Sequence, residues 1–324
     1  MKYMFKIILL IETFLVLFFS VGCVSTDIAT VEKKKTIAVI VKTKGNDFWK
    51  TVMLGAEAAA KEFDVNVEFT CPPNEKDADG QIEQVNRVIN KKVDAIVLAA
   101  CDYEKLVPVT EKAIDKGIPV VIIDSELNSS KISSFIATDN KEAGNLAGQK
   151  LLEIAGEQCN VVVMSFVKGT ATANQREKGL FEVINKHPGI KVLDIQYCYS
   201  EAEIAREQTK MVIKKYDKID AIVALNGPAA MGVADAIQNM NLQGKVKVIG
   251  FDSTHEEIDF MEADVIQATI VQNPFNMGYL GVKSVLEVLN EKSVPKNVDT
   301  GSKVIDKKNM YTPENQKLLF PFVN

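Results

Sequence analysis

Short apolar runs and longer amphipathic stretches alternate along most of this chain. The amphipathic stretches show helical patterns over residues 48–63, 78–91, 105–116, 141–155, 174–186, 201–215, 229–240 and 276–290. The apolar runs are rich in β-branched residues and predict ten strands, at 36–41, 65–69, 95–100, 119–124, 133–138, 160–166, 192–197, 221–225, 246–252 and 266–272. Most of these runs are apolar throughout, which is the pattern of strands that are covered on both faces.

The alternation of strand and helix predicts βαβ units and parallel sheets. Ten strands are too many for one doubly wound sheet in a chain of 324 residues, so we expect an α/β protein with two doubly wound parallel-sheet lobes. No Pro-, Gly- or Ser-rich linker separates the lobes, which predicts short crossings within otherwise regular structure. A (β/α)₈ barrel is the alternative fold.

Composition narrows the range of functions. The chain is 47% hydrophobic and 25% charged, which excludes a disordered chain, a collagen-like fibre and a polytopic membrane protein. Its formal net charge of −5 provides no broad basic surface for phosphate backbones, so nucleic acid is not an expected partner. The two histidines, His187 and His255, lie far apart in the sequence, which argues against a His-rich metal site. We expect no metal and no other cofactor.

The first 23 residues have the pattern of a sorting signal. Lys2 and Lys6 precede an apolar run over 7–22, which ends in small residues before Cys23. This order resembles the bacterial lipoprotein signal, in which the cysteine is lipidated and becomes the mature N-terminus, although Ser20 stands where that signal usually has leucine. The alternative is an uncleaved anchor helix. Both interpretations place residues 24–324 outside the cytoplasm, in the periplasm or on the outer face of a bacterial membrane, with 24–35 as a linker.

Four further cysteines are interpreted as structural residues: Cys71, Cys101, Cys159 and Cys198. Four cysteines allow three pairings, and the sequence does not choose among them. Cys101 and Cys159 lie in apolar surroundings, where a free thiol packs as a small hydrophobe. No CxxC or Cys/His spacing indicates zinc.

Polar side chains follow many of the predicted strands at their carboxyl ends, where ligands collect in open parallel sheets. No GxGxxG, GxxxxGK[ST] or GxSxG motif occurs, so neither a phosphate-binding loop nor a hydrolase nucleophile is indicated. The residues present are amides, carboxylates, one guanidinium and two aromatic rings: Asn46, Phe48, Trp49, Asp124, Asp139, Asn140, Arg176, Asn226, Asp252 and Gln272. They offer donors and acceptors to hydroxyl groups, and aromatic faces pack on the C–H faces of a sugar ring. The set suits a neutral polyol.

The chain also contains eight sequence blocks that resemble a known family in content and in order. They are TIAVIVKTKGNDFW, AIVLAACD, GIPVVIIDSE, FIATDNKEAGNLAGQKL, VKGTATANQREKGL, AIVALNGPAAMGVADAI, VKVIGFDS and ATIVQNPFNMGYLGV. These blocks resemble the type I periplasmic sugar-binding proteins of ABC importers, in the branch that contains the ribose-binding protein. The resemblance covers about residues 36–310.

The resemblance implies a non-catalytic ligand site at residues that match the family's motifs. Asn46 and Asp124 would bind sugar hydroxyls from the first lobe, with Phe48 and Trp49 stacking on the ring. The second lobe and the hinge would contribute Arg176, Asn226, Asp252 and Gln272. Two positions depart from the ribose pattern: Ser125 stands in place of an arginine, and Ser200 or its neighbour Tyr199 stands in place of an aromatic that covers the ring. We therefore expect a monosaccharide, but not necessarily ribose.

The resemblance further implies two lobes that close on the sugar by hinge motion. The N-terminal lobe would comprise 36–138 and 273–301, and the C-terminal lobe 139–272 and 302–324. The hinge would lie near 138–139, 272–273 and 301–302. A monomeric receptor held at the membrane by the lipid on Cys23 would deliver its sugar to an ABC permease. In the alternative, the closed form would be read by a membrane sensor, either a histidine kinase or a chemoreceptor.

Other interpretations of the same residues remain open. Asp124, Asn226 and Asp252 could be ordinary helix caps, and Phe48 with Trp49 could be the apolar start of a helix. Asp124 and Asp252 could also act as a carboxylate pair in an exported glycoside-acting enzyme. A sugar-responsive transcription regulator would need a helix-turn-helix where the signal segment stands. The stretch that begins at Asp77 superficially matches a calcium loop, but it lacks the bidentate glutamate.

Overall fold

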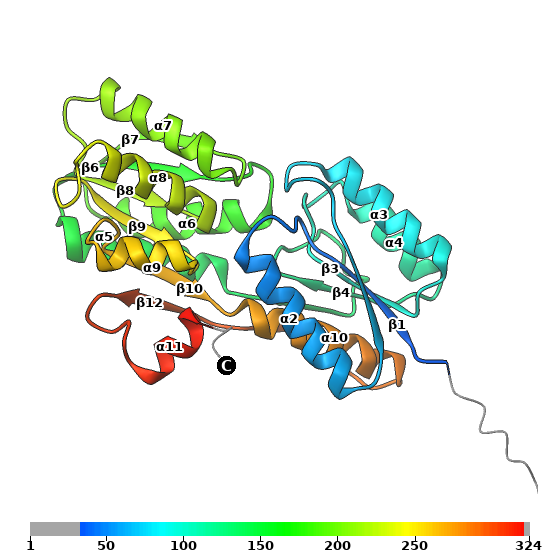
Figure 1. Ribbon diagram of the computed structural model, residues 1–324. Helices are drawn as coiled ribbons and strands as arrows, with labels where there is room; N and C mark the ends of the chain where they lie inside the picture. The colour runs from blue at the N-terminus through cyan, green and yellow to red at the C-terminus, as the bar shows by residue number, and fades with distance from the viewer. Residues whose placement is uncertain (1–32, 321–324) are drawn as a thin grey trace, which may run out of the picture. The chain divides into compact units, whose positions relative to one another are not determined.

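The computed structural model describes residues 33–320, and its strands form two six-stranded sheets (Figure 1). The predicted signal segment, Cys23 and most of the linker lie outside the described residues. The first sheet contains β1 (Thr36–Ile40), β2 (Asn66–Thr70), β3 (Ala95–Leu98), β4 (Val120–Ile123), β5 (Ser134–Ala137) and β11 (Asn297–Asp299). Its order is β11-β5-β4-β3-β1-β2, and every pair in it is parallel.

The second sheet repeats this arrangement with one difference. It contains β6 (Cys159–Ser165), β7 (Ile190–Tyr197), β8 (Ala221–Ala224), β9 (Lys247–Phe251), β10 (Ala268–Gln272) and β12 (Ser302–Asp306). Its order is β12-β10-β9-β8-β6-β7, with β12 antiparallel to β10 and the other pairs parallel. The prediction of two doubly wound α/β lobes is confirmed, and the barrel alternative is wrong.

Helices cover both sheets. The first sheet packs against α2 (Asp47–Glu62), α3 (Ala78–Lys91), α4 (Val107–Asp115) and α10 (Pro274–Leu289). The second is accompanied by α5 (Asn140–Ala155), α6 (Ala171–Ile184), α7 (Ala202–Lys215), α8 (Gly227–Asn239), α9 (His255–Glu262) and α11 (Pro313–Leu319). Within residues 33–320, no helix has the length and apolar character that crossing a membrane requires.

Strand β1 shows why the predicted strands are apolar throughout. Ala38 and Ile40 pack into a core with α3 and α4, whereas Ile37 and Val39 pack into a separate core with α2 and α10. All four side chains are fully buried. Because successive side chains of a strand point to opposite faces, a strand between two helical layers needs apolar residues at every position.

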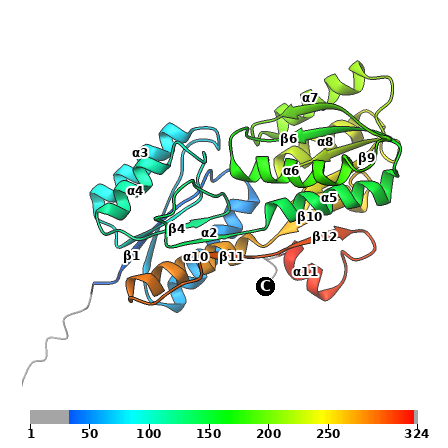
Figure 2. The same cartoon turned by 180° about the vertical axis from the view of Figure 1, so that it is seen from behind.

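The chain passes between the two sheets three times, after β5, after β10 and after β11. The first and third crossings are tied together, because the backbone N–H of Asp139 donates to Asp299 Oδ1 at 3.0 Å and the Thr138 hydroxyl donates to the Gly301 carbonyl at 3.3 Å. The second runs beside the third, since Gln272 pairs with Ser302. Figure 2 shows the three connections from behind.

Four short elements were missed by the pattern of apolar residues. β11 and β12 contain three and five residues, and α9 and α11 contain eight and seven. The residues of β11 and β12 are mostly polar or exposed, and no helix separates the two strands. The alternation of strand and helix therefore predicts neither of them.

The four cysteines within residues 33–320 are free thiols, with Cys101, Cys159 and Cys198 buried and Cys71 half-buried. Burial raises the pKa of Cys198 to about 11. The interpretation of these residues as small packing groups fits the positions of the three buried ones.

Helices α5 and α6 approach one another through glycines. A Cβ on Gly144 would overlap the Arg176 carbonyl oxygen, and one on Gly179 would overlap the Lys141 carbonyl oxygen. The close contact holds the segment that carries Arg176 against the start of α5, where Asn140 accepts its hydrogen bond.

The variant Gly144→Ala is therefore expected to lower the free energy of unfolding by about 1–3 kcal/mol, because overpacking forces the helices apart. Denaturant unfolding of the purified protein measures this. Gly45→Ala is the control, since its Cβ meets only Thr43 Oγ1 at 3.5 Å. Equal stability of the two variants would show that α5 and α6 can separate without cost.

Candidate functional site

A pocket of about 330 Å³ lies at the carboxyl ends of the strands, between the two lobes. This size is at the lower end of the range of about 300–1,000 Å³ for small-molecule sites. Its walls include all eight residues of the predicted ligand site, together with others: Lys42, Asn46, Phe48, Trp49, Glu75, Asp124, Phe166, Thr172, Arg176, Asn226, Pro228, Asp252 and Gln272. The structure therefore brings the eight residues together; their contact with a sugar stays a prediction.

Strand order explains the position of the pocket. In both sheets the order reverses beside the first strand, since β1 lies between β2 and β3, and β6 lies between β7 and β8. Ligands of open parallel sheets bind at such switch points, outside the carboxyl ends of the strands. Asn46 follows β1, and Asn226 follows β8, which pairs with β6.

The start of α2 supplies the two aromatic rings of the predicted ligand site, Phe48 and Trp49. Asn46 caps this helix, its side-chain oxygen accepting the backbone N–H of Trp49 at 3.1 Å. The Phe48 and Trp49 rings meet edge to face with centroids 5.0 Å apart. Trp49 is 2% exposed and belongs to the core of the first lobe, while Phe48 is half-buried. The capping role of Asn46 and its place in the pocket wall therefore coexist.

Asp124 is held by a lysine that the sequence did not single out. Lys42 Nζ lies 2.9 Å from Asp124 Oδ2, and both side chains are buried. Burial alone would lower the pKa of Lys42, but the negative charges of Asp124 and Glu75 raise it above its ordinary value. Lys42 stays charged, and it fixes the direction of the Asp124 carboxylate.

Asp124 and Asp252 occupy equivalent positions in the two lobes. Each is the first residue after a strand, and each has a left-handed backbone, with φ of 59° and 74°. Aspartate tolerates this region better than most residues. Neither is the N-cap residue of a helix, so that interpretation is wrong for both, although Asp252 accepts the N–H of Gly227, the first residue of α8, at 2.9 Å. Asn226 is the N-cap of α8 and accepts the N–H of Ala229 at 3.0 Å.

Arg176 is 3% exposed and lies against the aromatic rings of the second lobe. Its Nε donates to Asn140 Oδ1 at 2.8 Å, one guanidinium N–H donates to the Leu225 carbonyl at 2.7 Å, and the group lies 4.6 Å from the Phe251 ring centroid. Burial lowers the pKa of Arg176, although the negative charges of Asp252 and Asp124 act to raise it.

Asp139 lies at the first crossing, near which we expected the hinge, and it is the N-cap residue of α5.

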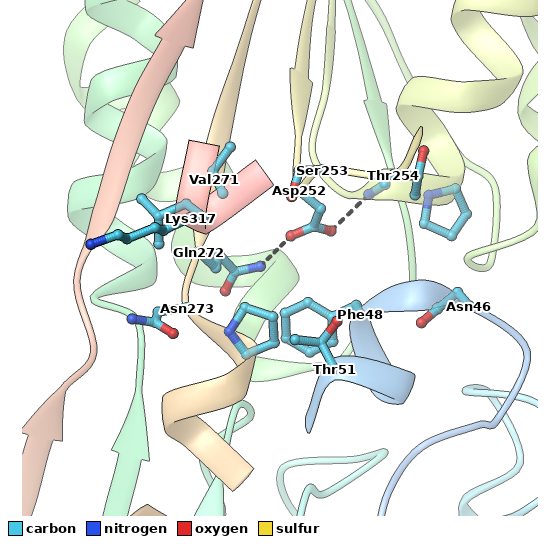
Figure 3. Close-up of a pocket in the computed structure, with 14 residues that line it drawn as sticks. Asn46, Phe48, Thr51, Asp252, Ser253, Thr254, Val271, Gln272, Asn273 and Lys317 are labelled. Atoms are coloured by element: carbon cyan, nitrogen blue, oxygen red, sulfur yellow. Dashed lines mark hydrogen bonds between the residues drawn. The ribbon is translucent and has the colours of Figure 1, made fainter. Parts of the chain in front are cut away.

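Asp252 bonds to the end of β10 and to the start of α8, both within the second lobe. Its Oδ1 accepts from Gln272 Nε2 at 2.6 Å, and its Oδ2 accepts the backbone N–H of Gly227 at 2.9 Å (Figure 3). Burial raises the pKa of Asp252, although Arg176 and Gln272 oppose this. The Gln272 amide oxygen is buried and has no hydrogen-bond partner among the described residues. A ligand hydroxyl would satisfy it.

A second pocket, of about 570 Å³, adjoins the first on the hinge side (Figure 3). The two share the walls formed by Asn46, Phe48, Pro228, Asp252 and Gln272. The rest of its lining comes from α2, from the second lobe, from the second crossing and from α11: Thr51, Gly227, Ser253, Thr254, Val271, Asn273, Pro274, Lys317 and Leu318.

The departures from the ribose pattern have distinct surroundings. Ser125 is 1% exposed, and its hydroxyl has no partner among the described residues. Tyr199 is 43% exposed and does not line the pocket. Ser200 donates to Glu75, a pocket residue that sequence reasoning missed. Glu75 follows β2, so the rule of strand carboxyl ends could have found it.

Behind Asp252 lies a second buried carboxyl group, Glu257, which is 1% exposed. Its Oε2 accepts the N–H of Thr254 at 2.9 Å in a capping box at the start of α9. Its Oε1 has no partner in the described part of the chain. Burial, with the charge of Asp252 in addition, raises the pKa of Glu257 well above its usual value.

Glu257→Gln is expected to remove a pH-dependent loss of stability. The folded state holds the Glu257 proton at pH values where the unfolded chain has released it. The free energy of unfolding therefore falls as pH rises from about 4.5 to the raised pKa, by about 1.36 kcal/mol for each pH unit in that window. The glutamine variant should match the wild type at low pH and exceed it above this window. Denaturant unfolding at a series of pH values measures the difference, with Glu256→Gln as the exposed control.

Comparisons with known proteins agree with this geometry. A family model described as periplasmic binding protein domain matches residues 37–293. The D-allose-binding periplasmic protein of Escherichia coli K12 is 30% identical over 264 residues, covering 79% of this chain and 84% of that protein.

Two solved structures extend the comparison. An ABC transporter solute-binding protein from Agrobacterium vitis with bound D-fucose superimposes with a TM-score of 0.86 at 35% identity, covering 88% of this chain and 99% of that one. A carbohydrate transporter solute-binding protein from Agrobacterium radiobacter with D-arabinose has a TM-score of 0.85 at 32% identity and the same coverage.

Proposed function

The chain belongs to the periplasmic binding protein family, and from this premise we propose that its inter-lobe pocket captures one free monosaccharide. The resemblance inferred from the eight sequence blocks is confirmed. The protein is the sugar-binding component of an ABC sugar importer and not an enzyme. The sugar differs among relatives, since one is named for D-allose and two others hold D-fucose or D-arabinose. The observation that carries the proposal is one pocket whose polar and aromatic walls come from both lobes.

Eight residues form the proposed sugar contacts. The first lobe contributes hydroxyl-binding groups and stacking rings, and the second lobe and hinge contribute further polar groups: Asn46, Phe48, Trp49, Asp124, Arg176, Asn226, Asp252 and Gln272. The unsatisfied amide oxygen of Gln272 supports this set, because a buried acceptor without a partner costs free energy until a ligand donates to it. Ser125 stands in place of the arginine of the ribose pattern, and Ser200 or Tyr199 in place of its aromatic, so the proposed ligand is a monosaccharide but not necessarily ribose.

The lobes are proposed to rotate about the three crossings. The proposed boundaries place 36–138 and 273–301 in one lobe and 139–272 and 302–324 in the other. The hydrogen bonds that tie the first crossing to the third support a shared hinge, because side-by-side strands can bend together. A sugar that contacts both lobes favours the closed form, since the open form lacks half of these contacts.

The protein acts outside the cytoplasm, with an ABC transporter as its partner. We further propose that Cys23 carries the lipid that holds a monomeric receptor beside its permease. The apolar run over 7–22 and the small residues before Cys23 support this. A histidine kinase or chemoreceptor that reads the closed form is the alternative partner.

The sugar proposal is tested by thermal unfolding of residues 24–324 with pentoses, hexoses and inositols. A ligand at about 100 times its Kd stabilises a protein by about 2.7 kcal/mol, so one or two sugars should raise the Tm clearly. Asp252→Asn should abolish that rise, because Gln272 loses the carboxylate to which it donates and Arg176 loses a nearby negative charge. Asp264→Asn is the control, with a similar φ of 58° outside the pocket. No shift with any sugar would contradict the proposal.

The anchor proposal is tested in cells fed with a radiolabelled fatty acid. The full chain should take up the label and remain with the membrane, because its signal resembles that of lipoproteins. Cys23→Ser should lose the label, whereas Cys71→Ser should keep it. Unlabelled full chain would point to the uncleaved anchor helix.

A further inference from the structure

Glu75 is a buried carboxylate that bonds residues from both lobes. It lies between β2 and α3 and is 7% exposed. Its Oε1 accepts from the Trp49 indole N–H at 2.8 Å, and its Oε2 accepts from the Ser200 hydroxyl at 2.7 Å. Ser200 in turn accepts from Asn226 Nδ2 at 3.0 Å. We call the connected side chains Trp49, Glu75, Ser200 and Asn226 the latch.

Three latch residues, Trp49, Glu75 and Asn226, line the pocket of about 330 Å³. Glu75 lines this pocket and also an outer space of about 1,560 Å³, which Ser200 and Tyr199 line as well. The Glu75–Ser200 hydrogen bond therefore lies between the pocket and the outside. Sugar atoms on this edge face a carboxylate, and a large substituent there would have to break the latch.

The backbone places a hydroxyl, and not an aromatic ring, against Glu75 behind this wall. Tyr199 and Ser200 both have left-handed φ values, of 56° and 58°. Ser200 bonds to Glu75, while the Tyr199 ring lies outside, 5.3 Å from the Lys76 ammonium. A stacking aromatic ring would make this wall apolar, whereas Glu75 with its bond to Ser200 makes it polar.

Glu75 also has capacity left to bind a ligand. A carboxylate offers about four lone-pair sites, and the hydrogen bonds from Trp49 and Ser200 occupy two of them. A buried carboxylate with too few donors is costly. A sugar hydroxyl on this edge would supply a further donor, whereas a deoxy sugar would not, and sites built to pair a hydroxyl discriminate strongly against its absence.

We propose that Glu75 is a specificity-determining residue, which selects monosaccharides with a free hydroxyl, and no larger substituent, on the edge that faces the latch. This inference rests on the proposed sugar-binding function. Ser200 is a positioning residue, which holds the Glu75 carboxylate in the closed form and slows the release of the sugar.

The test measures the Kd of D-allose, D-ribose, D-arabinose and D-fucose, and of their commercially available monodeoxy analogues, by titration calorimetry. For the sugar that binds wild type most tightly, we expect one deoxy position to weaken binding at least tenfold. Glu75→Gln should weaken binding of the parent sugar about tenfold and leave that analogue nearly unchanged, so the discrimination collapses. Glu126→Gln is the matched control, because Glu126 also bonds across the lobes, to Gln175 at 3.1 Å, but does not line the pocket.

Ser200→Ala keeps the inference testable if Glu75→Gln folds poorly. Its sugar should dissociate about tenfold faster with an unchanged association rate, because the Glu75–Ser200 bond joins the two lobes and has to break before they separate. Trp49 is the only tryptophan of the chain, so its fluorescence in stopped flow reports both rates at the latch itself. The double variant should bind no more weakly than Glu75→Gln alone, since both changes break the same bond.

Two results would overturn the inference. Glu75→Gln could weaken the parent sugar and every deoxy analogue by one common factor, which would make Glu75 purely structural. Alternatively, the effects of Glu75→Gln and Ser200→Ala could add independently. Failure of wild type to bind any sugar would instead refute the proposed function, so the two failures are distinguishable.

Discussion

The mutual neutralisation of buried charge is the constraint on which the site depends. Carboxylates and cations converge on a pocket of about 330 Å³, and an unpaired charge there would cost several kcal/mol. Lys42 neutralises Asp124, and Arg176 lies close enough to Asp252 to oppose the rise in its pKa. These pairs exist because parallel strands deliver their carboxyl ends to one edge, and left-handed turns then aim the side chains inward. The fold and the site are therefore consequences of the same strand direction.

Most of the fold was accessible from the sequence because its strands lie between helical layers. Such strands are apolar at every position, and most of them are followed by an amphipathic helix, so that the two signals reinforce one another. The signal weakens where this arrangement ends. β11 (Asn297–Asp299) and β12 (Ser302–Asp306) lie at sheet edges, have exposed polar side chains, and follow one another across a crossing. Their pairing is decided by tertiary contact and not by periodicity.

The residues of the site also differ in how far the sequence predicts them. Residues directly after strands, such as Asp124 and Asp252, were accessible because strand ends meet at a known edge. Lys42 was not, because a lysine after a strand usually reaches solvent, and only the fold reveals that it is 2% exposed. Ser200 and Glu75 are 125 residues apart, and nothing local marks them as partners. Hydrogen bonds between the lobes form only because the two lobes lie close together, and the spacing of residues in the sequence does not indicate this proximity.

The three crossings also govern the order in which the protein can be completed. The first sheet takes its edge strand from residues 297–299, and its core includes Met277, Val282 and Val285 of α10. An N-terminal fragment that ends before residue 297 therefore contains neither lobe complete, and a nascent chain must be nearly finished before its first sheet can be completed. The topology therefore postpones the completion of either lobe until almost the whole chain has been synthesised.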